Sequence, residues 1–237
     1  MELFKNFALL IILSELVFAS CASNSSNPVV EDGKDTYTII GPDYRNQGKV
    51  SYDSLEGKLI SSTGCEVAYT FLRPRDVSKD VLVILGHGFM RSKRRMAYLA
   101  QHLASWGLSV VNMEYCNSKL WAGNHDRNGA DMAAVSRKLK AGKVIYVGFS
   151  AGGLAAMVAA NLDINTRAVL GLDMVDNQGL GKKIAPDLAV PFFGLIAAPS
   201  ICNAKNNGLD SYALAPHSNV IKVEDTSHCH FEFPVDG

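Results

Sequence analysis

The chain has 237 residues, of which 48% are hydrophobic and 19% charged, and its 23 basic and 23 acidic residues give a formal net charge of zero. This length and composition are typical of one globular domain with a single hydrophobic core. Nucleic-acid binding requires a basic stripe, which the balanced charge does not provide, so no nucleic-acid partner is expected.

The N-terminus resembles an export signal. Within residues 1–20, a lysine precedes an apolar run and small residues follow it. The run is shorter than the roughly 20 residues that a membrane-spanning helix needs. The residues around Cys21 are similar to a bacterial lipoprotein processing site, which makes Cys21 a candidate for lipidation and membrane attachment, with plain secretion as the alternative. Residues 21–36 read as a flexible tether and residues 37–237 as one domain.

Strand-like and helix-like patterns alternate along this domain. A β region begins near residue 41, and strands are expected at 67–72, 81–85, 109–113, 144–147, 168–172, 190–198 and 219–223. Helices are expected around 96–103, 130–139 and 151–162. Continuous apolar runs such as 81–85 are typical of strands covered on both faces. The alternation predicts an α/β fold with a doubly wound, mainly parallel sheet.

A candidate nucleophile follows one of these strands. Residues 148–153 read Gly-Phe-Ser-Ala-Gly-Gly, directly after the apolar run 144–147. This is the G-x-S-x-G pattern in the strand–turn–helix setting that projects a serine hydroxyl above a sheet. The turn is strained and needs small neighbours, which explains the glycines. We therefore expect Ser150 to be a nucleophile; the alternative is a glycine-rich strand-to-helix turn without catalytic function.

A serine nucleophile needs a base, and the base needs an orienting carboxylate. In this architecture the chain order is serine, acid, histidine. His228 follows the last expected strand and is the preferred base, with His230 as the alternative. Asp173 at the tip of strand 168–172 is the preferred acid, with Asp176 as its rival. The His-x-His spacing also occurs among metal ligands, but no cysteine or carboxylate cluster accompanies it, so no metal is expected.

Acyl transfer also needs N–H donors for the oxyanion. The backbone N–H of Ala151, next after the nucleophile, is one expected donor. The other is expected in the turn after strand 81–85, at the N–H of Phe89. In the same turn Gly88 allows a tight bend, and His87 is expected to buttress the turn rather than to act as a base.

The cysteines fit an exported protein. Apart from Cys21, the chain has Cys65, Cys116, Cys202 and Cys229, and four cysteines allow three pairings. We expect Cys202 to pair with Cys229, because both follow strands that should be neighbours. Free buried thiols are the alternative.

These motifs together resemble the α/β-hydrolase superfamily, and in particular its chlorophyllase-like and cutinase-like (polyester hydrolase-like) serine esterases. The resemblance covers roughly residues 65–233 and rests on the segments 81–89, 99–111, 148–153, 172–175 and 227–231. It implies hydrolysis of a carboxylic ester through an acyl-enzyme by Ser150, Asp173 and His228, without a cofactor. The substrate partner would be an ester of unspecified acyl and alcohol parts, and the sequence indicates no oligomeric state.

Two departures accompany the resemblance. Met174 stands where the family commonly has a proline, and only nine residues follow His228, so the usual C-terminal helix is expected to be lacking. Without this helix, apolar surface near the last two strands would be exposed and the His228 loop would be poorly held. The alternatives to an esterase are a lipase or peptidase of the same fold, or a non-catalytic surface binding module.

Overall fold

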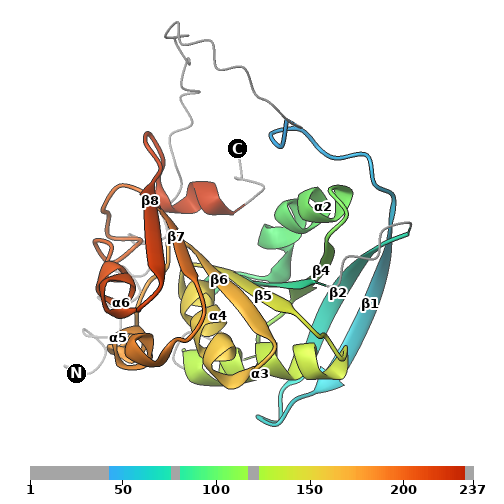
Figure 1. Ribbon diagram of the computed structural model, residues 1–237, viewed down its shortest axis with the longest axis horizontal. Helices are drawn as coiled ribbons and strands as arrows, with labels where there is room; N and C mark the ends of the chain where they lie inside the picture. The colour runs from blue at the N-terminus through green and yellow to red at the C-terminus, as the bar shows by residue number, and fades with distance from the viewer. Residues whose placement is uncertain (1–42, 76–80, 117–122, 233–237) are drawn as a thin grey trace, which may run out of the picture.

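The computed structural model describes residues 43–75, 81–116 and 123–232 (Figure 1). The expected signal segment, Cys21 and the tether lie outside these residues. Within the described part of the chain, no helix has the length and apolar character that crossing a bilayer requires.

The described residues form one open sheet of eight strands in the order β1-β2-β4-β3-β5-β6-β7-β8. In this order, β1–β2 and β2–β4 are antiparallel pairs, and every other neighbouring pair is parallel. The strands are β1 Tyr52–Ile60, β2 Glu66–Pro74, β3 Leu82–Gly86, β4 Ser109–Met113, β5 Val144–Phe149, β6 Thr166–Leu172, β7 Phe192–Ile196 and β8 Ser218–Lys222. The sheet is therefore mixed and mostly parallel, as the sequence predicts.

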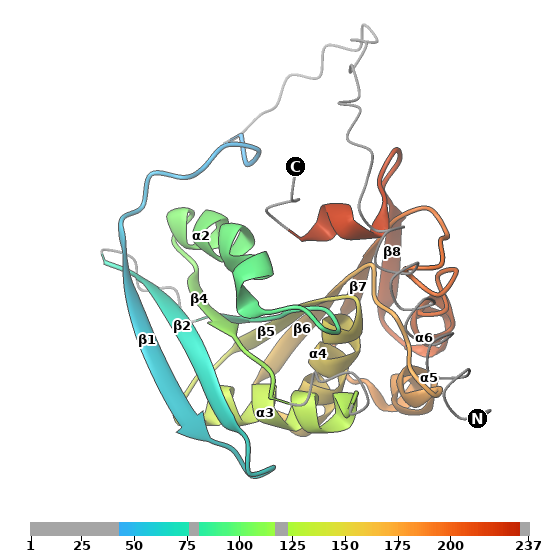
Figure 2. The ribbon, with the colours of Figure 1, turned by 180° about the vertical axis from the view of Figure 1, so that it is seen from behind.

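Helices cover both faces of the sheet, as Figures 1 and 2 show. Helix α2 lies on one face, and α3, α4, α5 and α6 lie on the other. The helices are η1 Lys93–Met96, α2 Ala97–Ser105, α3 His125–Lys138, α4 Ala151–Leu162, α5 Leu180–Ile184, η2 Ala185–Asp187, α6 Leu209–Leu214 and η3 His228–Phe231, where η marks a 3-10 helix. The layers are those of a doubly wound α/β fold.

The core has two parts, one on each side of the sheet. All five residues of β3 are buried, and they alternate between the two sides: Ile84 joins the cluster under α3 and α4, whereas Val83 and Leu85 join the cluster under α2. This is why the run reads as continuously apolar. Phe231 of η3 packs against the α2-side cluster, while Phe193 of β7 remains exposed.

The chain adds β4 on one side of β3 and β5 on the other, so β3 and β5 are neighbours at a topological switch point. Open α/β sheets bind their ligands at such points, beyond the carboxyl ends of the strands. The turn after β3 and the turn after β5 both lie there.

The prediction of a disulfide between Cys202 and Cys229 is wrong. Cys65 is bonded to Cys116, with 5.9 Å between their Cα atoms, and Cys229 is a free, buried thiol. The reason is the antiparallel pairing of β2 with β4. This pairing brings the residue just before β2 beside the residues just after β4.

Candidate active site

The turn between β5 and α4 holds Ser150 in a strained conformation. Its φ of 55° and ψ of −123° lie outside the regions that non-glycine residues favour. The neighbouring glycines make this possible, because a Cβ on Gly148 would overlap the carbonyl group of Gly152, and a Cβ on Gly152 would overlap the carbonyl of His87. The residue types of the motif are therefore set by the close approach of three backbone segments.

Ser150, Asp173 and His228 form a continuous chain of hydrogen bonds. His228 Nε2 lies 3.1 Å from Ser150 Oγ, and His228 Nδ1 lies 2.6 Å from Asp173 Oδ2. All three residues are buried. With its proton on Nδ1, the imidazole donates to the carboxylate and accepts from the hydroxyl. The structure thus brings together three residues that are 23, 55 and 78 positions apart in the sequence.

The backbone around Asp173 fixes its carboxylate. Asp173 has a φ of 47°, and its N–H donates to the carbonyl of Leu195 at the end of β7. Its side chain is buried, and Oδ1 accepts a hydrogen bond from the backbone N–H of Ala197 at 3.0 Å. Asn203 Nδ2 donates to Oδ2 at 3.1 Å, on the same oxygen that faces His228. The acid is therefore oriented by the loop that follows β7.

Asn203 is the residue of this site that sequence reasoning missed. It is fully buried, its Nδ2 also donates to the carbonyl of Ala198, and its Oδ1 accepts from the N–H of Ser200. It therefore holds the loop after β7 closed around Asp173. Its only sequence signal is an asparagine in a loop, which is also an ordinary turn residue.

His228 is the first residue of η3, and its ring packs on Phe149 with 4.7 Å between ring centroids. A capping box holds the start of η3: His230 Nδ1 accepts from the N–H of Ser227 at 3.2 Å, and the Ser227 side chain accepts from the N–H of His230. His230, the alternative base, is exposed and has this capping contact in place of one to Ser150.

Asp176, the alternative acid, precedes α5, and its side chain contacts the first turn of that helix. Its carboxylate accepts hydrogen bonds from the backbone N–H groups of Gly181 at 2.7 Å and Lys182 at 3.2 Å. A carboxylate at the N-terminus of a helix satisfies donors that have no partner inside the helix. Of the two candidate acids, only Asp173 contacts His228 in the described residues.

The turn after β3 lies against the nucleophile. A Cβ on Gly88 would lie 3.4 Å from the Cβ of Ser150 and 2.9 Å from the Phe149 ring, so only glycine fits there. Phe89, an expected oxyanion donor, follows Gly88 directly. Ala151, the other expected donor, begins α4, where the first N–H groups of a helix lack intrahelical partners.

His87 is buried at the base of this turn, where its Nδ1 lies 2.8 Å from the carbonyl oxygen of Gly88, and its Nε2 lies 2.9 Å from Glu114 Oε1 and 3.2 Å from the backbone nitrogen of Tyr115. These contacts are those of a residue that buttresses the turn.

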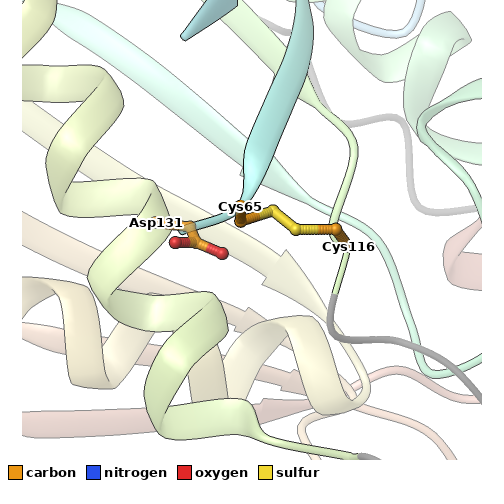
Figure 3. Close-up of side chains that lie close together, drawn as sticks. All are labelled: Cys65, Cys116 and Asp131. Atoms are coloured by element: carbon orange, nitrogen blue, oxygen red, sulfur yellow. A yellow bond between two sulfur atoms is a disulfide. The ribbon is translucent and has the colours of Figure 1, made fainter. Parts of the chain in front are cut away.

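A second cluster of chemically active residues lies away from the serine. The ligand atoms of Cys65, Cys116 and Asp131 are all within 4.8 Å of one another (Figure 3). The two sulfur atoms form a disulfide, which lacks the thiolates that metal binding requires. The Asp131 carboxylate accepts hydrogen bonds from the hydroxyl groups of Ser61 and Thr63. In this form the cluster joins β2, β4 and α3 rather than offering a metal site.

Neither a scan against models of known protein families nor a search of curated proteins finds a match to this chain. The arrangement of the site and the fold around it are therefore the basis for the function proposed below.

Proposed function

We propose that the chain is a serine hydrolase of the α/β-hydrolase superfamily that cleaves carboxylic esters through an acyl-enzyme. The observation that carries the proposal is the hydrogen-bond chain from Ser150 Oγ through His228 to Asp173. A hydroxyl, an imidazole and a carboxylate in this order define a nucleophile, a general base and an orienting acid. The setting at the carboxyl ends of β5, β6 and β8, next to the switch point, supports the same function.

In the proposed reaction, His228 Nε2 takes the hydroxyl proton as Ser150 Oγ attacks the ester carbonyl carbon. Asp173 holds the imidazole in the required tautomer and stabilises its charged form. His228 then gives the proton to the leaving alcohol, and the acyl group remains on Ser150. Water attacks this acyl-enzyme with His228 again as the base, which releases the carboxylic acid and restores Ser150.

The negative charge on the tetrahedral intermediate would be stabilised by the backbone N–H groups of Phe89 and Ala151. Loss of one such donor typically costs about 10²–10³ in rate. The side chains of Phe89 and Met90 are exposed beside this position. Apolar side chains at the rim favour esters with an apolar acyl or alcohol group, presented in an open cleft. No cofactor takes part in this scheme.

Export is part of the proposal, with Cys21 as a lipid attachment site. Metabolic labelling with a fatty-acid probe tests this point independently of the chemistry. A labelled wild-type chain and an unlabelled Cys21→Ala variant would support lipidation, whereas unlabelled, secreted wild-type protein would support plain secretion.

The test of the chemistry is labelling by a fluorophosphonate, which reacts with activated serines. We expect the wild-type chain to be modified at Ser150, the Ser150→Ala variant to be inert, and a control variant of the exposed Ser54, Ser54→Ala, to react like the wild type. A folded wild-type chain that does not react would refute the proposal in favour of a non-catalytic binding module. Turnover of p-nitrophenyl esters compared with the matching anilides then separates an esterase or lipase from a peptidase.

A further inference from the structure

An ion pair that the proposed chemistry does not use lies next to the site. Arg91 Nε donates to Glu232 Oε1 at 2.8 Å, and the side chains of Arg91 and Glu232 are 23% and 4% exposed. The second carboxylate oxygen of Glu232 is buried without a hydrogen-bond partner among the described residues. Glu232 therefore depends on Arg91 to balance a charge that is almost wholly removed from water.

The Arg91 end of this pair belongs to the turn that carries the expected oxyanion donor. The backbone N–H of Arg91 donates to the carbonyl of Gly88 at 3.2 Å, which closes a four-residue turn around Phe89 and Met90. Met90 has a φ of 55°, a conformation that costs energy for a residue with a side chain. Strained turns persist when surrounding contacts fix them.

The Glu232 end belongs to the segment that carries the base. Glu232 directly follows η3, whose first residue is His228, and its N–H donates to the carbonyl of Cys229 at 3.3 Å. Burial raises the pKa of the Cys229 thiol, and the nearby Glu232 carboxylate adds to this effect, so the thiol is neutral. Since Arg91 belongs to the turn after β3 and Glu232 to the segment after η3, the ion pair joins two segments that are 141 positions apart in the sequence.

We propose that Arg91 and Glu232 are positioning residues that hold the turn after β3 and the η3 segment in one fixed relation across the site. Under the proposed function, this relation sets the distance from the imidazole of His228 to the oxyanion position at Phe89. The two residues act through Phe89 and His228 and do not touch the reacting atoms. The inference rests on the proposed esterase function.

The closest test is Glu232→Gln, which keeps the side-chain shape and removes the charge. We expect kcat for a p-nitrophenyl ester to fall by about 10- to 100-fold, because small displacements of reacting groups are costly. KM should change by less than about threefold, since the exposed Phe89 and Met90 side chains are untouched. Arg91→Met should show the same loss, and Arg91→Lys should recover part of it.

The matched control is an ion pair far more open to solvent. Lys182 and Asp210 are 3.0 Å apart with side chains 49% and 65% exposed, and Lys182→Gln should leave kcat unchanged. Hydrogen exchange followed by mass spectrometry supplies a second readout on the same proteins. Glu232→Gln should speed exchange both in the turn at residues 88–91 and in the segment 227–232.

The outcomes separate the two proposals. A wild-type chain that neither reacts with fluorophosphonate nor turns over ester would overturn the proposed function, and the positioning role with it. An active wild type with an equally active Glu232→Gln variant would overturn the positioning role alone. Faster exchange confined to 227–232 would also overturn it, because the two segments would then not be joined. Because Glu232→Gln is isosteric, it decides the matter even where Arg91→Met fails to fold.

Discussion

The contact between Asn203 and Asp173 gives a prediction whose size follows from one distance. Asn203→Asp replaces a buried amide with a carboxyl group of the same shape, 3.1 Å from Asp173 Oδ2. When both groups are ionised, two like charges face each other out of contact with water. At an effective dielectric constant of about 20, their repulsion is about 5 kcal/mol.

This repulsion should appear as a pH dependence of stability. One pKa unit corresponds to about 1.4 kcal/mol, so the pKa of the introduced carboxyl should rise by as much as about 4 units from its unfolded value near 4. When folding raises the pKa of a group, its contribution to the free energy of unfolding is fully present below the unfolded pKa. That contribution is lost as pH rises toward the folded pKa. At about pH 4, the free energy of unfolding of the variant should therefore be close to that of wild type, apart from about 1 kcal/mol for the lost second N–H donor. Its stability relative to wild type should then fall as pH rises toward neutrality.

Urea denaturation of both proteins at several pH values measures this difference in the free energy of unfolding. Asn219→Asp, on the exposed strand β8, is the control and should show little pH dependence. A difference between the Asn203→Asp variant and wild type that is the same at every pH would refute the reasoning. It would mean that the introduced carboxyl does not sense Asp173.

Three further predictions concern other parts of the molecule. Replacing Cys65 and Cys116 with serine opens a loop of 51 positions and should cost about 4 kcal/mol of unfolding free energy, with dithiothreitol destabilising the wild type more than the variant. Burial lowers the pKa of His125, which favours its neutral form in the fold; wild-type stability should fall as pH drops below about 6.5, where the unfolded imidazole takes up a proton, and His125→Gln should lose less stability in the same urea series. Gly148→Ala places a methyl group on the carbonyl of Gly152 and should lower stability by about 3 kcal/mol or more, measured by thermal denaturation against wild type.

The regular part of the fold could be predicted because its signals are local. Helix α4 begins and ends at the predicted residues, and β5 follows from a continuous apolar run. Helices α5 and α6 have five and six residues, less than two turns, so no hydrophobic period could reveal them. The first turn of α3, from His125 onward, was missed because its sequence His-Asp-Arg-Asn-Gly is polar although several of these side chains are buried.

Within the site, only the residues that follow the ends of strands could be predicted from the sequence. Ser150, Asp173 and His228 each follow a strand, and the order of the strands brings them together. The contacts that hold them depend on loop conformations that no local pattern encodes. Asn203 reaches Asp173 because the loop after β7 turns back, with Ala204, Lys205 and Asn206 all at positive φ. The Cys65–Cys116 pairing depends in the same way on an antiparallel register between β2 and β4.

The hydrogen bond between His228 and Ser150 spans 78 positions, and this separation has a consequence for folding kinetics. Contacts between residues that are distant in the sequence form late, because the entropy of loop closure is lost before the contact contributes favourable free energy. The bond requires β5, β6, β7 and β8 to pair in that order across one sheet. During refolding, nucleophile reactivity should therefore appear after the bulk of the secondary structure. The time course of labelling by a reactive-serine probe would then report when the pairing of β5, β6, β7 and β8 is complete.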